Sequence, residues 1–248
     1  MKNTHRHFPT ASKTRATRFQ MAAGIALVLA GTFGMAQVAS AQVGPTPAEA
    51  VVFQGLHTAA HKGDVAQIEK LAASKADVNA RSSHGRTPVH VATFARQREA
   101  LRALAKAGAN LNLLENDRYD GITIASVADD EETLRVLIEL GASAKQTTSR
   151  YDGTALIAAA HLGHDGVVRQ LIKAGAPLDH VNNLHWTAVI ESIVLGDGGK
   201  RHQATLKALI DAGANLQLKD RTGATPLQLA RSRGYGEMVK MLEAAGAK

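Results

Sequence analysis

The chain has 248 residues, with 29 Lys and Arg against 22 Asp and Glu, and it contains no cysteine. The lack of cysteine excludes disulfides, a lipoprotein anchor and thiolate metal sites. The formal net charge of +7 is concentrated at the N-terminus, because the first 20 residues hold five basic side chains and no acidic one. The remainder has 24 basic and 22 acidic side chains, so the charge gives no reason to expect a nucleic-acid partner.

The N-terminus has the three parts of a secretory signal in order. The basic stretch Met1–Gln20 is followed by an apolar run from Met21, and the run ends in Ala39-Ser40-Ala41, a small-x-small cleavage site. We therefore predict a signal peptide over 1–41, cleaved after Ala41, and a bacterial protein that is periplasmic or secreted. No twin arginine precedes the run, which favours general secretion. The alternative is an uncleaved membrane anchor, because the run approaches a spanning length.

A short linker over 42–46 is predicted to lead into the first folded residues. Thr46-Pro47-Ala48-Glu49 has the pattern of a helix start, with Thr46 as N-cap, Pro47 in the first turn and Glu49 as the acidic residue of a capping box.

A six-residue phrase then recurs six times and sets the organisation of the chain. Its leading leucines are 33, 33, 34, 38 and 33 residues apart, a period typical of stacked helical repeats. An aliphatic residue three positions earlier completes an apolar helix stripe, and glycine follows in five copies, with Lys75 in the first. The copies are LAASKA (Leu71–Ala76), LAKAGA (Leu104–Ala109), LIELGA (Leu137–Ala142), LIKAGA (Leu171–Ala176), LIDAGA (Leu209–Ala214) and LEAAGA (Leu242–Ala247).

These phrases predict an all-α solenoid of about six helix-turn-helix repeats with hairpin-like loops, each repeat burying its faces against its neighbours. The C-terminal repeat carries polar residues, as expected for a solvated end. The repeat domain is predicted over 47–248, and the approximate repeats are 47–80, 81–113, 114–145, 146–180, 181–218 and 219–248.

The repeats resemble those of the ankyrin family. Repeat two reads Gly85-Arg86-Thr87-Pro88-Val89-His90-Val91-Ala92 and repeat six Gly223-Ala224-Thr225-Pro226-Leu227-Gln228-Leu229-Ala230. The resemblance covers Pro47–Lys248 and implies rigid stacked repeats that bind a protein partner through a concave face, with no catalysis and no cofactor. Leu184-His185-Trp186-Thr187-Ala188 and the Leu195-Gly196-Asp197-Gly198-Gly199 that follows resemble a bacterial subgroup of exported ankyrin proteins. Such proteins are in some cases associated with oxidative-stress enzymes such as catalase, which implies an accessory role.

Three repeats depart from the regular period. Repeats three to five keep a threonine (Thr123, Thr154, Thr187) but lack the proline. Repeat three is predicted to be degenerate: its first helix, Thr123–Asp129, is about three residues shorter than Thr154–Gly163, and the preceding loop, Gly108–Thr123, is three residues longer than in repeats two, five and six. The loop of repeat four is one residue longer, and repeat five has about five extra residues, Asp197–Arg201, between its helices. Insertions in such folds map to surface loops.

The loops of repeats three to five are the candidate partner-binding site. Three of the four Tyr and Trp residues of the chain fall in these consecutive loops, and Arg, Tyr and Trp are enriched at binding hot spots. The alternative is that the aromatic side chains brace the loops against one another. The predicted contact residues are Arg118, Tyr119, Arg150, Tyr151, His185, Trp186 and Glu191.

Glu191 stands apart because it is an acidic residue among apolar ones in the first helix of repeat five. A buried carboxylate needs a partner. We expect either a hydrogen bond to the backbone of a neighbouring loop or contact with a ligand in the groove.

Other chemistries are weakly supported. The glycine-rich Gly196–Gly199 resembles a phosphate cradle but follows a helix and lacks the required spacing, so an inter-helix turn or a partner contact is the better interpretation. His57 and His61, and His161 and His164, have spacings that can hold zinc, but His57, His90, His164 and His202 occupy positions where ankyrin histidines bond backbone groups. There is no G-x-S-x-G motif, and the acidic pairs precede helices.

We therefore expect a non-enzymatic, monomeric protein-binding module without cofactor or metal, and without stable membrane association after signal cleavage. A membrane-tethered scaffold that keeps residues 1–41 is the main alternative, and a metal- or ligand-dependent factor is the weaker one.

Overall fold

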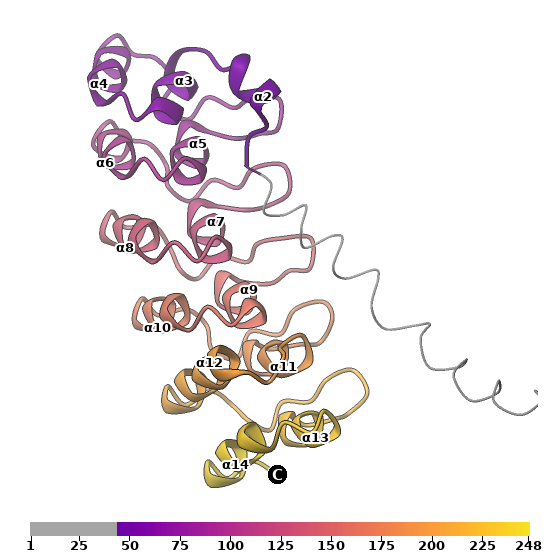
Figure 1. Ribbon diagram of the computed structural model, residues 1–248. Helices are drawn as coiled ribbons and strands as arrows, with labels where there is room; N and C mark the ends of the chain where they lie inside the picture. Colours follow the sequence, from indigo (N-terminus) through magenta and orange to yellow (C-terminus); the bar gives the residue numbers. More distant parts are fainter. Residues whose placement is uncertain (1–43) are drawn as a thin grey trace, which may run out of the picture. The chain divides into compact units, whose positions relative to one another are not determined.

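The computed structural model describes residues 44–248, and the predicted signal peptide over 1–41 lies outside this part. Within it the chain forms thirteen helices, and its one isolated bridge joins Thr148 and Gly153. Twelve helices form six antiparallel pairs stacked in chain order (Figure 1). This confirms the predicted all-α solenoid of six repeats.

The first helix of each pair forms an inner layer and the second an outer layer. Inner helices contact inner helices of the neighbouring repeats, and outer helices contact outer ones. The inner helices are α3 (Gly55–Lys62), α5 (Pro88–Phe94), α7 (Gly121–Val127), α9 (Ala155–Leu162), α11 (Ala188–Val194) and α13 (Pro226–Ser232). The outer helices are α4 (Val65–Ala73), α6 (Arg98–Lys106), α8 (Glu131–Glu139), α10 (Asp165–Lys173), α12 (Lys200–Asp211) and α14 (Gly236–Ala244).

The recurring leucine is the reason that the pairs stack. Leu104, Leu137, Leu171, Leu209 and Leu242 are all fully buried in the core that the stacked pairs share. Burial of a leucine side chain stabilises the fold by about 2 kcal/mol. Leu71, in the first repeat, is only partly buried.

Inner helices begin at an N-cap residue and outer helices end before a left-handed residue. Thr154 Oγ1 accepts from the Ile157 amide, and Thr225 and Gln228 form a full capping box. The second residue after each outer helix has a positive φ, for example 87° at Gly108 and 62° at Lys75. Lys75 therefore adopts the left-handed conformation that glycine supplies in the other repeats.

Repeat three is regular, and the prediction of a shortened first helix is wrong. Its inner helix α7 has seven residues, like α5 and α11, and begins at Gly121 after the N-cap Asp120. The Asp120 carboxylate accepts from the Thr123 amide at 2.7 Å. The alignment of Thr123 with the capping threonines of other repeats was wrong, because Asp120 is the N-cap here. The preceding loop is therefore not three residues longer.

Repeats four and five have the predicted extra residues, with one correction. In repeat five only 195–199 separate α11 from α12, because Lys200 and Arg201 start the outer helix. This lengthens α12 to 12 residues, where the other outer helices have 9. The Gly198 turn is packed against the next repeat, since the Tyr235 hydroxyl donates to the Gly196 carbonyl at 2.8 Å.

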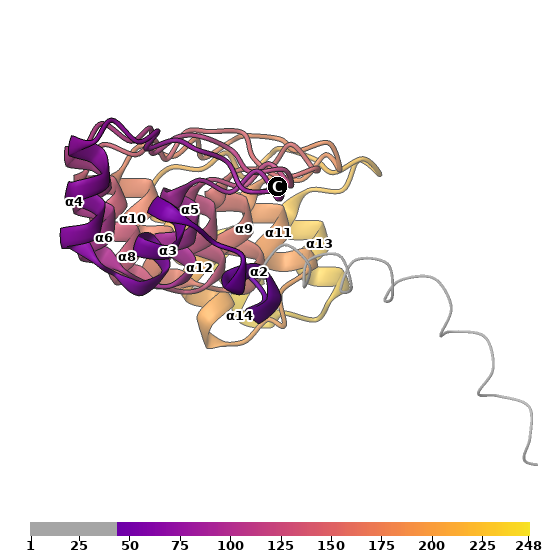
Figure 2. The same cartoon turned by 90° about the horizontal axis from the view of Figure 1, so that it is seen from above.

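One helix lies outside the six pairs. α2 (Pro47–Val51) precedes the first repeat and lies on the side of α3 toward which the inter-repeat loops project (Figures 1 and 2). Thr46 caps it and Pro47 is in its first turn, as predicted. The Glu49 carboxylate does not complete a capping box, because it is paired with Arg86 at 2.6 Å.

None of the described helices has the length and apolar character needed to cross a membrane.

Candidate protein-binding site

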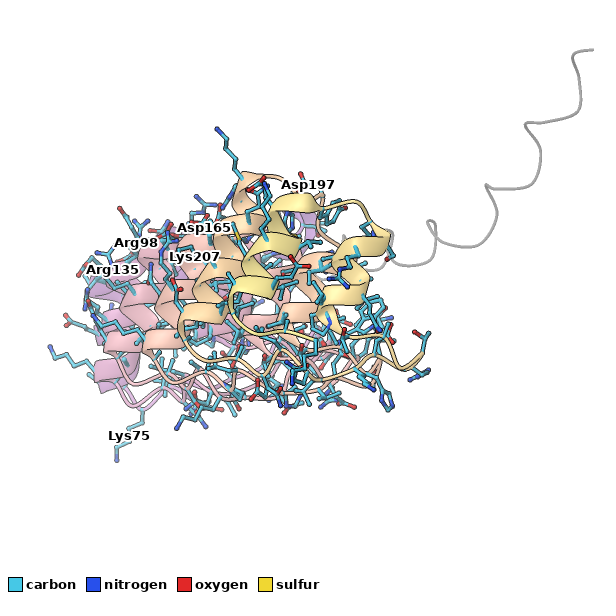
Figure 3. The ribbon with its side chains drawn as sticks, turned by 90° about the horizontal axis from the view of Figure 1, so that it is seen from below. Lys75, Arg98, Arg135, Asp165, Asp197 and Lys207 are labelled. Carbon is cyan, nitrogen blue, oxygen red and sulfur yellow. The ribbon has the colours of Figure 1, made fainter. Side chains whose placement is uncertain are left out.

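The loop that precedes each inner helix is called here the finger loop of that repeat. These loops project to one side of the two helix layers and are superposed in the view from above (Figure 2). The exposed charges of the outer helices lie elsewhere: Arg98, Arg135, Asp165 and Lys207 project from α6, α8, α10 and α12 (Figure 3). The finger loops and the inner helices thus form a surface distinct from the charged outer helices.

In repeats two to six the finger loop has a left-handed residue two positions before the N-cap of the inner helix, which we call the fingertip residue. It is Gly85 in repeat two and Gly223 in repeat six, with φ of 71° and 85°. In repeats three to five it is instead Arg118, Asp152 and His185, with φ of 66°, 51° and 63°. A side chain in this region costs about 1 kcal/mol or more relative to glycine. Three consecutive repeats therefore retain strained polar residues at their fingertips.

Both predicted arginines are used to join finger loops. Arg118 Nη1 lies 2.9 Å from Asp152 Oδ1, and Arg150 Nη2 lies 3.8 Å from Asp117 Oδ1. The Asn183 side-chain amide donates to the Arg150 carbonyl at 3.0 Å, which links the next loop. All four charged side chains are about half exposed, so each ion pair adds less than about 1 kcal/mol. The structure thus favours the interpretation that the two arginines brace neighbouring finger loops against one another.

The three predicted aromatic side chains lie on the same surface and are all partly exposed. Tyr119 and Trp186 each stand immediately before an N-cap, Asp120 or Thr187, and Tyr151 stands three positions before the N-cap Thr154. Burial of the ring raises the pKa of the Tyr119 hydroxyl. The backbone amides of Tyr119 and Trp186 are held by Glu115 Oε1 and Asn182 Oδ1. Their loop backbone is therefore fixed while their rings remain available.

His185 is the exposed fingertip of repeat five, and the same repeat carries other exposed apolar surface. Leu195, directly after α11, is 42% exposed, and Val181 in the finger loop is 44% exposed. Val194, the last residue of α11, is partly exposed beside them in sequence. Repeat five therefore offers apolar contact area at both its finger loop and its inner-helix end.

Glu191 is inside the structure. Its carboxylate is 4% exposed, accepts from the Asn182 side-chain amide at 3.0 Å and lies 3.6 Å from His161 Nδ1. Burial raises its pKa to about 7. Burial likewise lowers the pKa of His161, with further lowering by His202. Of the two expectations for Glu191 the structure favours the hydrogen bond, with a side-chain amide in place of the backbone as donor.

The ankyrin-type histidines bond backbone carbonyls, as predicted. His57 Nε2 lies 2.8 Å from the Arg86 carbonyl oxygen, His90 Nε2 lies 3.0 Å from that of Tyr119, and His202 Nε2 lies 2.9 Å from that of His161. His57 and His90 thus bond from an inner helix to the next finger loop, and His202, near the start of α12, bonds back to α9. Among residues 44–248 there is no group of three or more His, Asp or Glu placed to hold a metal ion.

Sequence reasoning missed one cluster at repeat two. Glu49, Arg86 and Phe94 come together there, with the Arg86 guanidinium carbon 5.1 Å from the centre of the Phe94 ring. The ion-pair partners are 37 residues apart in a region where Glu49 matched a capping box, so no local signal pointed to their contact.

Family models of ankyrin repeats match residues 53–115, 122–220 and 198–243. The chain belongs to the ankyrin repeat family. It is 33% identical over 190 residues to the ankyrin repeat protein YahD of Escherichia coli K12, an alignment covering 76% of this chain and 94% of YahD. Proteins of this family generally bind other proteins.

Two crystal structures with the ankyrin fold are more than 25% identical in sequence to this chain. An ankyrin repeat domain from Acinetobacter baumannii AYE has 44% identity and a TM-score of 0.73, covering 78% of this chain and 98% of that one. The ankyrin repeat protein EF0377 has 28% identity and a TM-score of 0.71, covering 79% and 100%. The ankyrin repeat domain of Bcl-3 shares the fold at 23% identity, a TM-score of 0.71 and coverage of 79% and 88%.

Proposed function

We propose that this ankyrin repeat protein is a non-enzymatic binding module whose finger loops and inner helices in repeats three to five hold a protein partner. One observation carries this proposal. In repeat two, His84 and Arg86 stand three and one positions before the N-cap and contact α2, a helix that is not part of any repeat. Of the six corresponding positions in repeats three to five, three hold aromatic residues, Tyr119, Tyr151 and Trp186, and the others hold Asp117, Gly153 and Leu184. Each of repeats three to five therefore has a partly exposed aromatic residue at one of the two positions that contact an added helix in repeat two.

The physical character of this surface supports protein recognition. Tyr and Trp bring large contact areas with few rotatable bonds, and a preformed surface loses little ordering entropy on binding. The ion pairs between Arg118 and Asp152 and between Arg150 and Asp117 hold neighbouring finger loops in register before a partner arrives.

Site-specific photocrosslinking tests the proposal directly. A photoreactive residue in place of the exposed fingertip His185 should crosslink a protein partner in a periplasmic extract, whereas the same residue in place of Arg135, on the outer helix α8, should not. Alanine at Tyr119, Tyr151 and Trp186 together should abolish the product from position 185. A product from position 135 that survives the triple substitution would place the partner on the outer helices and overturn the proposal.

We further propose that the protein acts outside the cytoplasm, with the signal segment 1–41 removed and the partner a periplasmic or secreted protein. Support comes from the order of basic stretch, apolar run and Ala39-Ser40-Ala41. N-terminal sequencing of the exported form should begin at Gln42, whereas an intact Met1 on membrane-bound protein would favour the tethered scaffold. A stress-defence enzyme such as catalase is the partner class that the resemblance to exported ankyrin proteins suggests.

A further inference from the structure

The short helix α2 is attached to repeat two by one buried ion pair. Glu49 and Arg86 are each 8% exposed, and Arg86 Nη1 donates to Glu49 Oε2 at 2.6 Å. His84 Nδ1 lies 3.3 Å from the other carboxylate oxygen. A guanidinium binds a carboxylate through strong, charge-assisted hydrogen bonds, so this contact fixes where α2 lies.

An aromatic ring lies against the guanidinium that binds the carboxylate. Phe94, the last residue of α5, lies under the Arg86 guanidinium, with 5.1 Å between the guanidinium carbon and the ring centre. The backbone of Gly44 runs against the same ring, since a Cβ on Gly44 would stand 3.2 Å from Phe94 Cδ1. Arg86 is thus held between an aromatic face and an acidic side chain, an arrangement that pre-orients its donors.

The positions involved are those of the proposed partner surface. Arg86 and Phe94 stand one position before and seven positions after the N-cap of repeat two. The same two positions are Tyr119 and Val127 in repeat three, and Trp186 and Val194 in repeat five. Arg86 is therefore buried beside segment 44–52 in repeat two, whereas Tyr119 and Trp186, at the same position, are partly exposed in repeats three and five.

Segment 44–52 does not fill all of the space beside repeat two. Its last residues, Val51 and Val52, are 84% and 67% exposed although they are apolar. A hollow of about 340 Å³ remains beside it, lined among others by Glu49, Val52, Phe53, His57, Arg81 and Ser82. A segment with larger side chains after its carboxylate would fill more of this space.

We propose that Arg86, His84 and Phe94 form a carboxylate-binding subsite for an acidic peptide segment, and that Glu49 of α2 occupies it in cis as an exchangeable ligand. The occupying chemistry is one Asp or Glu followed by apolar residues, as in Glu49-Ala50-Val51-Val52. A tethered ligand has an effective concentration of about millimolar, so a segment of a partner already bound to repeats three to five competes on equal terms. That last step rests on the proposed function, whereas the subsite itself does not.

The test uses the full exported chain and a labelled peptide with the sequence of residues 46–53. The Glu49→Gln variant keeps the shape of the side chain and removes its charge, so Arg86 should be released. Amide exchange over 48–53 should become about tenfold faster than in the unsubstituted protein, with α7 and α9 unchanged. The peptide should bind this variant about tenfold more tightly than it binds the unsubstituted protein, because the tethered competitor is weakened.

Three controls decide the result. A peptide with Gln in place of its Glu should not bind, and Arg86→Gln added to Glu49→Gln should abolish peptide binding. Glu49→Asp should retain the slow exchange. Equal binding to both proteins, binding that survives Arg86→Gln, or no binding at millimolar peptide would overturn the subsite. No partner is used, so failure here leaves the proposed function standing, and failure of the crosslinking experiment leaves the subsite standing.

Discussion

Repeats two and three have inner helices of equal length and finger loops of the same geometry, yet they present different surfaces. In repeat two the residue before the N-cap is Arg86, and it is covered by α2 through Glu49. In repeat three it is Tyr119, which is partly exposed, and the fingertip is Arg118 in place of a glycine. The comparison teaches that the repeat frame fixes where a side chain stands, while the residue chosen there decides whether the chain binds itself or another molecule.

The largest effect concerns Glu191, which is buried in the inner helix α11 of repeat five. Its pKa is raised from 4.5 to about 7, so between these pH values the folded protein keeps a proton that the unfolded chain releases. The contribution of Glu191 to the free energy of unfolding should therefore fall by roughly 3 kcal/mol as pH rises from 4.5 to 8. Glu191→Gln should remove this decrease and be the more stable protein at pH 8.

Chemical denaturation at several pH values checks this. His90 and His161 contribute in the opposite sense, because burial lowers the pKa of each, that of His90 to about 4, and stability is then lost as pH falls below 6.5. The difference between the two proteins at each pH is therefore the quantity to compare. The exposed Glu99→Gln serves as the matched control and should leave the profile unchanged. Parallel profiles for the Glu191→Gln and unsubstituted proteins would show that the carboxylate is not titrating near neutrality.

The second effect concerns repeat two, where α2 covers the residue before the N-cap. Arg86→Ala leaves the Glu49 carboxylate without its guanidinium and removes the group that lies over Phe94. We expect a loss of about 2 kcal/mol in thermal or urea unfolding, less than for most buried pairs because α2 can move into water. Tyr119→Ala, at the equivalent open position, should cost less than half as much. Equal losses at the two positions would contradict the distinction between covered and open repeats.

The third effect tests how repeat three begins. Asp120→Ala should destabilise the protein by about 2 kcal/mol, because the side chain caps α7 and also accepts from the Gln146 side-chain amide at 2.7 Å. Thr154→Ala, which removes only a cap, should cost about 1 kcal/mol. Were Thr123 the first capping residue, the order of these two losses in urea unfolding would be reversed.

The smallest effect concerns the fingertips. His185→Gly relieves a left-handed histidine and should stabilise the protein by about 0.5 kcal/mol. Arg118→Gly should be close to neutral, because it also removes the ion pair with Asp152. The reverse control, Gly223→His, should destabilise by about 1 kcal/mol. Melting temperatures that rank these three variants otherwise would show that fingertip strain is relieved in another way.

The fold could be predicted from the sequence because its determinant is periodic. Each copy of the leucine phrase places an apolar stripe and a left-handed residue at fixed positions, and Leu104 and Leu137 are fully buried as that pattern requires. The alignment of one repeat with the next was harder to predict where another residue type takes the place of the capping threonine. Asp120 caps as well as a threonine does, and the nearby Thr123 drew the alignment three residues along.

The sequence could predict that neighbouring repeats contact one another, but not which residues pair. Arg118 pairs with Asp152 across 34 residues, and Arg201 of the lengthened α12 reaches Asp129 across 72. Such pairs depend on how adjacent repeats are rotated, which a repeat pattern does not encode. The pairing of Glu49 with Arg86 also depends on a segment outside the pattern, so the covered part of the surface had no signal of its own.

The most direct test of the central claim is the amide-exchange footprint of the protein bound to the partner that His185 crosslinks. We expect protection over 116–128, 150–162 and 183–196, the finger loops and inner helices of repeats three to five, with the outer helices α6, α8 and α10 unchanged. Protection confined to those outer helices, with the finger loops exchanging as in the unbound protein, would contradict it.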